Sequence, residues 1–117
     1  MQYKILLSER MQEFAEPTTI LEPSPERVMV TPHLEYEFYE HIYIHNFIKT
    51  AVWAEKNGYD AVVIGCFYDP GLREARELVK IPVVGVCESS VHVAAMLSAG
   101  KFSILVGREK WIPKMAA

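Results

Sequence analysis

The chain has 117 residues, half of them hydrophobic and 23% charged, a composition typical of one small globular domain or one half of a two-lobed protein. Its formal charge of −3 and the lack of a basic cluster argue against nucleic acid as a partner. No apolar run reaches the about 18 residues of a membrane-spanning helix, and the N-terminus lacks the pattern of a signal peptide. Two cysteines are too few for a disulfide scaffold, so we expect reduced thiols and a cytoplasmic location.

The first part of the chain has a mixed pattern of predicted elements. The apolar run at residues 3–7 predicts a first strand, and residues 8–14 predict a short helix that ends before a proline. Two later runs, 18–21 and 27–30, are rich in β-branched or apolar residues, and the pattern does not decide which of them is the second strand. We therefore expect residues 1–33 to form an irregular N-terminal βαβ part.

The longest predicted helix covers residues 34–57. Its apolar residues recur mostly at spacings of three and four, and Gly58 follows at the position where a left-handed residue often ends a helix. Residues 61–66 are apolar throughout rather than alternating. This pattern predicts a strand that is covered on both faces of a parallel sheet.

A second helix and strand follow. Asp69, Pro70 and Gly71 are predicted to begin the helix, with Asp69 as its N-cap and Pro70 at the first helical position. Residues 81–86 are again continuously apolar and predict the next strand.

Three further elements complete the pattern. Ser89 or Ser90 is predicted to cap a helix that ends at Gly100, residues 102–106 predict a last strand, and residues 111–115 predict the first turns of a further element. The resulting order, β-α-β-α-β-α-β-α-β with short connections, predicts the α/β class. We expect an open parallel sheet with right-handed crossovers and helices on both faces.

Several chemically active residues follow the predicted strands. Cys66 ends one strand, Asp69 lies just beyond it, and Ser89 and Ser90 begin the helix after the next strand. Ligands bind at the carboxyl ends of strands in such folds, and two helix N-termini there would favour a carboxylate and lower the pKa of a thiol. The alternatives are an inert core cysteine and purely capping roles for the aspartate and the serines.

Redox and metal chemistry are two further possibilities. Cys87 ends the strand next to that of Cys66, so a redox pair is conceivable, although the close C-x-x-C spacing is absent. Glu37, His41 and His45 share one helix face at four-residue spacing and could hold zinc. We favour a solvated polar face for these three, and we expect no metal and no cofactor.

The stretch at residues 58–72, Gly-Tyr-Asp-Ala-Val-Val-Ile-Gly-Cys-Phe-Tyr-Asp-Pro-Gly-Leu, resembles the Asp/Glu/hydantoin racemase superfamily, most closely the hydantoin racemases. There the same pattern carries the first catalytic cysteine. The resemblance extends without gaps over about residues 57–106 and keeps the glycines, the proline and the cysteine in place.

The resemblance implies one lobe of a two-lobed fold, with the active site between two similar α/β halves and one cysteine from each half. One thiolate removes the proton next to the substrate carbonyl or carboxylate, and the other thiol returns a proton to the opposite face. By this resemblance Cys66 is the first catalytic cysteine. The residues expected to bind substrate are Gly65, Phe67, Asp69, Ser89 and Ser90.

Two positions depart from the family pattern. An Asn-Pro-Asn-Thr-like motif usually follows the first strand, and residues 7–10 are Leu-Ser-Glu-Arg instead. The second cysteine of the family lies in the second half, and Cys87 does not match it. We therefore treat residues 34–106 as the best-matched core and residues 107–117 as the start of an unfinished element, in a chain that stops short of its partner half.

The predicted function is a cysteine-dependent, cofactor-independent racemase or isomerase that acts on an amino acid, a hydantoin or a related carboxylate. Because only the first cysteine is present, we expect the chain alone to be weakly active or inactive. The alternatives are a single-thiol decarboxylase and a non-catalytic small-carboxylate-binding or interaction domain. A missing half would leave an apolar face bare, so we also expect a homo-oligomer or a C-terminal half as partner.

Overall fold

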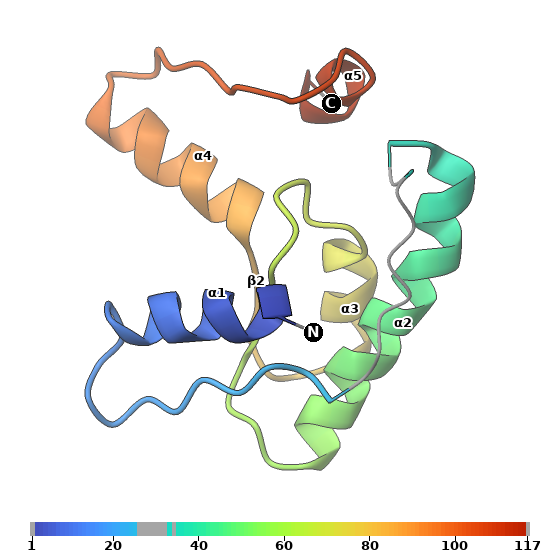
Figure 1. Cartoon of the computed structure of the whole chain (residues 1–117), viewed down its shortest axis with the longest axis vertical. Helices are drawn as coiled ribbons and strands as arrows, with labels where there is room; N and C mark the ends of the chain where they lie inside the picture. The colour runs from blue at the N-terminus through green and yellow to red at the C-terminus, as the bar shows by residue number, and fades with distance from the viewer. Residues whose placement is uncertain (1, 26–32, 34, 117) are drawn as a thin grey trace.

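A computed structural model of the chain describes residues 2–25, 33 and 35–116, and Figure 1 shows the arrangement of its elements. Within these residues the helices and strands follow the order α1 (Gln2–Gln12), α2 (Glu37–Lys56), β1 (Val62–Ile64), α3 (Leu72–Leu78), β2 (Val83–Gly85), α4 (Val86–Leu97) and α5 (Trp111–Ala116). No helix among the described residues is both long enough and apolar enough to cross a membrane.

The sheet consists of β1 and β2, which run parallel and are connected through α3. Val62 pairs with Val83 and Ile64 with Gly85. The backbone N–H of Val62 also donates a 2.9 Å hydrogen bond to the carbonyl of Pro82. Parallel strands that are joined by a helical crossover define the α/β class, so the predicted fold class is confirmed.

The hydrophobic core lies between this sheet, α2 and α3, which pack against each other (Figure 1). Side chains alternate along a strand, and only the face towards α2 and α3 contributes to the core, so the prediction of strands covered on both faces is wrong. Val63 and Val84, which point to the other face, remain partly exposed. The buried core residues are Ala51, Ile64, Leu72, Ala75, Val79 and Val83.

The helix predicted over residues 34–57 is confirmed as α2, and its C-terminus has the expected geometry. Gly58 adopts a left-handed φ of +78°, and the N–H of Tyr59 reaches back to the carbonyl of Ala54 at 3.1 Å. The same carbonyl also accepts from the N–H of Asn57, so two donors close the last turn of the helix. This geometry turns the chain directly into β1.

The predicted strand at residues 3–7 is wrong, because these residues belong to α1. A helix satisfies its own backbone groups, whereas a strand there would need a neighbour in the sheet. The helix predicted over 8–14 is confirmed only as far as Gln12. The Leu7 side chain lies so close to Gly65 that an added Cβ there would be 2.9 Å from Leu7 Cδ2, which places α1 beside the end of β1.

Of the two candidates for the second strand, the structure describes only residues 18–21, and these do not form a strand. Residues 18–21 are irregular, since the Gln12 side chain donates to the carbonyl of Thr19 at 2.7 Å and accepts from the N–H of Leu21 at 3.2 Å. A side-chain amide therefore replaces the hydrogen bonds of a strand ladder. Residues 27–30 lie outside the described part of the chain.

The last predicted strand, residues 102–106, is also wrong, because it pairs with no strand among the described residues and Leu105 is 98% exposed. The further element predicted at 111–115 is confirmed as α5. Lys114 of α5 forms an ion pair with Glu40 of α2, and Arg108, just before α5, pairs at 2.6 Å with Glu35, just before α2.

Candidate functional site

Cys66 lies two residues beyond the end of β1, in the loop of residues 65–71 that leads to α3. Its side chain is partly buried and packs against the hydrophobic core. Both Cys66 and Cys87 are free thiols, so the bridged redox pair is not formed. The prediction that Cys66 sits at the carboxyl end of a parallel strand is confirmed.

Asp69 does not cap the helix that follows it, which corrects the sequence prediction. The N-cap of α3 is Gly71, with a φ of +72° and no side-chain hydrogen bond. The Asp69 carboxylate instead accepts hydrogen bonds from the N–H groups of Cys87, at 3.0 Å, and Glu88, at 2.7 Å. These groups belong to the first turn of α4, so Asp69 caps that helix, through N–H groups 18 and 19 positions further along the chain, in place of its own.

Ser89 and Ser90 are likewise not N-caps, because α4 begins at Val86 with Gly85 as its N-cap, which places both serines inside the helix. The Ser90 hydroxyl donates a 2.6 Å hydrogen bond to the carbonyl of Val86 within the helix. Both serines are exposed. The first turn of α4 needs no serine cap, because the Asp69 carboxylate already binds two of its N–H groups.

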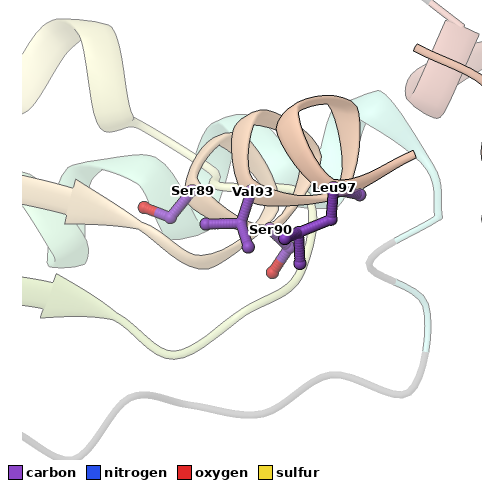
Figure 2. A pocket seen from close by; sticks show the side chains of 5 residues that line it. Ser89, Ser90, Val93 and Leu97 are labelled. Atoms are coloured by element: carbon purple, nitrogen blue, oxygen red, sulfur yellow. The ribbon is translucent and has the colours of Figure 1, made fainter. Parts of the chain in front are cut away.

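Two shallow hollows follow the surface of α4. The larger, of about 480 Å³, is shown in Figure 2, where Ser89, Val93 and Leu97 lie along the helix. A second, of about 260 Å³, is lined by Phe67 and Ser90 together with residues 102–105. The structure thus brings two predicted binding residues, Phe67 and Ser90, to one hollow. Cys66 and Asp69 do not line either hollow.

The electrostatic surroundings of Cys66 are negative. Burial raises the pKa of the Cys66 thiol, the negative charges of Asp69 and Glu40 raise it further, and the backbone N–H of Tyr68 opposes them. The predicted lowering of this pKa is therefore wrong for the chain as folded here. The physical reasons are the burial of the thiol and the Asp69 carboxylate, which already accepts hydrogen bonds from the N–H groups at the start of α4.

Cys87 shows the same trend on the neighbouring element. Burial raises the pKa of its thiol, and the charge of Asp69 adds to the effect. A carboxylate that acts on both thiols disfavours both thiolates, which is the opposite of what a pair of open helix N-termini would do.

Tyr68 is a site residue that the sequence analysis missed. Its hydroxyl is buried, and no described residue hydrogen-bonds to it. Its ring lies 4.8 Å from that of Trp111 in α5. Burial raises the pKa of the phenol, with smaller contributions from Cys66 and Glu40. Its only signal in the sequence is its position two residues after Cys66, and the contact with residue 111 is visible only in three dimensions.

Arg76 is a second residue that sequence analysis missed. Its guanidinium binds both carboxylate oxygens of Glu88, at 3.0 and 2.6 Å, while its Nε donates to the carbonyl of Val83 at 3.0 Å. One side chain of α3 thus connects the start of β2 with the first turn of α4. A bidentate pair of this kind holds its partners in a defined orientation.

Among the described residues, no group of three or more His, Cys, Asp or Glu side chains is placed so that it could hold a metal ion. Glu37, His41 and His45 are all exposed on α2. Gly65 is exposed at the end of β1, and Phe67 is 43% exposed beside the thiol.

The fold and site together define an α/β protein with a free thiol at the carboxyl end of a parallel strand. The family model described as Asp/Glu/Hydantoin racemase matches residues 35–116. The chain therefore belongs to the Asp/Glu/hydantoin racemase family, as the motif at residues 58–72 had indicated.

Three curated relatives agree with this assignment. The chain is 42% identical over 88 residues to a hydantoin racemase of Pseudomonas sp. (strain NS671), covering 75% of this chain and 34% of the relative. It is 46% identical over 59 residues to a hydantoin racemase of Rhizobium meliloti, covering 50% of this chain and 24% of the relative. A hydantoin racemase of Paenarthrobacter aurescens is 41% identical over 73 residues, covering 62% and 30%. The chain thus spans about a third or less of the length of these relatives, and no solved structure gives a significant match.

Proposed function

We propose that the chain forms part of a cofactor-independent racemase or isomerase in which Cys66 exchanges a proton with the carbon next to a carbonyl group. The observation that carries this proposal is the position of Cys66. It is a free thiol at the strand end, inside the residues matched by the racemase family. A thiol at that place can act on a ligand bound outside the carboxyl ends of the strands.

The proton balance of the reaction needs two groups. A thiolate takes the proton from the carbon, the electron pair of the C–H bond passes into an enolate, and a thiol on the opposite face gives its proton to that carbon. The raised pKa favours the thiol form of Cys66, so in the chain alone only its thiolate fraction removes the proton, and the same sulfur returns a proton to the same face. Inversion then needs a group on the other face, which comes from a second α/β unit in another polypeptide segment.

The charges around Cys66 favour one substrate class within the family. Asp69 and Glu40 are the charged groups that act on this thiol, and both are negative. A free carboxylate close to the sulfur would be repelled, whereas an uncharged carbonyl of a cyclic amide would not. We therefore favour a hydantoin-like ring over a free amino acid, in agreement with the names of the relatives.

Proton exchange tests this proposal directly. One enantiomer of a 5-substituted hydantoin is incubated with the chain in D₂O, loss of the proton at carbon 5 is followed by NMR, and inversion is followed by optical rotation. We expect exchange above the uncatalysed rate, with inversion slower than exchange, because the second acid–base group is absent. Cys66→Ser should return exchange to the background, and Cys87→Ser should not. Equal exchange by the chain and by Cys66→Ser would overturn the proposal.

A second candidate function, an interaction domain, is favoured by the surface of α4. None of the residues of α4, all of them described, is buried, and Met96 and Leu97 are 77% and 83% exposed. Apolar side chains gathered on one helix are typical of a surface that a partner covers. If Cys66→Ser leaves proton exchange unchanged while the chain sediments as a stable complex, this function is favoured over the racemase.

A further inference from the structure

We infer that Asp69 is the positioning residue of the Cys66 loop, because its carboxylate takes the place of a bound anion at the first turn of α4 and thereby fixes residues 65–71. This inference deepens the proposed function, in which Cys66 is the catalytic residue. Asp69 itself is not catalytic: it acts through the backbone of the loop and through its negative charge.

The first argument is the pair of hydrogen bonds that crosses between two elements. The two oxygens of Asp69 accept separately, Oδ1 from the N–H of Cys87 and Oδ2 from the N–H of Glu88. The N–H of Asp69 in turn donates to the carbonyl of Cys66 at 3.0 Å. The main chain of the thiol residue is therefore connected through one aspartate to the helix that follows the neighbouring strand. Hydrogen bonds to an ionised acceptor are among the stronger ones in proteins.

The second argument is the backbone of Asp69, which has a φ of +55°. Residues other than glycine rarely adopt this left-handed conformation, and asparagine and aspartate tolerate it best. This conformation costs free energy, so it persists only where neighbouring groups hold the residue in place, as the two N–H groups of α4 do here.

The third argument is the packing around the carboxylate. A Cβ added at Gly85 would overlap the Asp69 carboxylate and lie 2.8 Å from Leu72 Cδ2, so only glycine leaves room at the end of β2. Pro70 is fully buried. A Cβ at Gly71 would lie 3.3 Å from Ile44 Cγ2 of α2. The second half of the loop thus contacts α2 and β2 through close packing and α4 through the Asp69 carboxylate.

The charged and titratable groups that respond to Asp69 can be named. Its charge raises the pKa values of the Cys66 thiol, the Cys87 thiol and the Arg76 guanidinium. Arg76 is already bound by Glu88, so it does not neutralise Asp69 through a direct ion pair. A change at Asp69 should therefore appear at the thiols.

The test is the pH dependence of iodoacetamide alkylation at Cys66 in the full chain, read by peptide mass. Asp69→Asn keeps the left-handed backbone and one acceptor oxygen but removes the charge. We expect alkylation of Cys66 at neutral pH to become at least about threefold faster, with the profile moved to lower pH. Glu88→Gln is the matched control, since it removes a carboxylate from the turn of α4 that Asp69 binds. It should leave the alkylation profile of Cys66 unchanged.

A second variant tests the anion-like role of the side chain. Asp69→Gly suits a positive φ and removes the carboxylate, so Cys66 should react faster at every pH because the loop is loosened. Added sodium acetate should slow this reaction towards the wild-type rate in Asp69→Gly, and should have no effect on the wild type. A wild-type profile in Asp69→Asn together with no effect of acetate on Asp69→Gly would overturn the inference, even if both variants were less stable. Since alkylation requires no substrate, failure of hydantoin exchange would count against the proposed function alone.

Discussion

Two neighbouring regions of the molecule bury their apolar residues to opposite extents. We call residues 62–85 the crossover unit and residues 86–106 the α4 arm. The crossover unit supplies most of the buried core, including Ile64, Leu72 and Val83. The α4 arm has a similar share of apolar side chains, yet α4 contains no buried residue and Leu105 is 98% exposed. Stability should therefore reside in the crossover unit, while the arm is free to contribute to binding.

The largest expected effect comes from a pair of leucine substitutions, one in each region, that tests this comparison. Leu72→Ala removes a side chain that is 7% exposed, and it should lower the free energy of unfolding by about 2–4 kcal/mol, through lost burial and a cavity. Leu105→Ala makes the same chemical change in the arm and should shift stability by no more than about 0.5 kcal/mol. Urea denaturation followed by circular dichroism measures both. Equal losses would show that the arm is packed in solution.

The same comparison shows how far the sequence can predict the fold. Residues 61–66 and 102–106 are equally apolar, but only the first run becomes a strand, because β2 lies beside it and α2 and α3 cover one face. Strand formation depends on a neighbour that hydrogen-bonds, and this is not encoded in the run itself. The helix of α2 and its glycine terminus were predictable, because periodicity and a left-handed end are local properties.

For the candidate site as well, one part could be predicted from the sequence and another part could not. The position of Cys66 followed from the strand pattern and the family motif, and the structure agrees. The partners of Asp69 were not predictable, because the carboxylate reaches backbone groups 18 and 19 residues away instead of the helix that it precedes. Capping rules describe local bonds, so a cap supplied by another element is invisible to them.

A second prediction concerns two glycines, Gly85 at the end of the crossover unit and Gly107 just after the α4 arm. Gly85→Ala should destabilise the chain by about 1–3 kcal/mol, because its methyl group would overlap the Asp69 carboxylate and contact Leu72. Gly107→Ala is the matched control, since an added Cβ there has no atom within 4 Å and φ is not positive. Thermal denaturation measures the difference. A neutral Gly85→Ala would mean that Asp69 can leave α4 at little cost.

The third prediction uses pH and addresses the C-terminal segment. A hydrogen bond from its own backbone N–H holds the pKa of Glu35 below the usual value of 4.5, against the effect of burial, and Arg108 lowers it further. The stabilising contribution of this carboxylate is therefore present above pH 4.5 and lost as the pH falls through the lower folded pKa. In a Trp53→Phe background, Trp111 fluorescence should change over this acid range. Glu35→Gln should remove that transition, and an unchanged transition would contradict the role of the pair.

The smallest expected effect belongs to the serines at the start of the α4 arm. If Ser89 or Ser90 capped α4, replacing it with alanine would cost about 1 kcal/mol. Because the cap is Asp69 and Ser90 only bonds back to the Val86 carbonyl within an exposed helix, Ser89→Ala and Ser90→Ala should each change stability by less than about 0.5 kcal/mol. Alanine also has the higher helix propensity, which offsets the lost hydroxyl bond. Chemical denaturation of both variants beside Asp69→Gly separates a cap supplied by the loop from one supplied by the helix itself: only the loop variant should lose stability and, at the same time, alter the alkylation of Cys66.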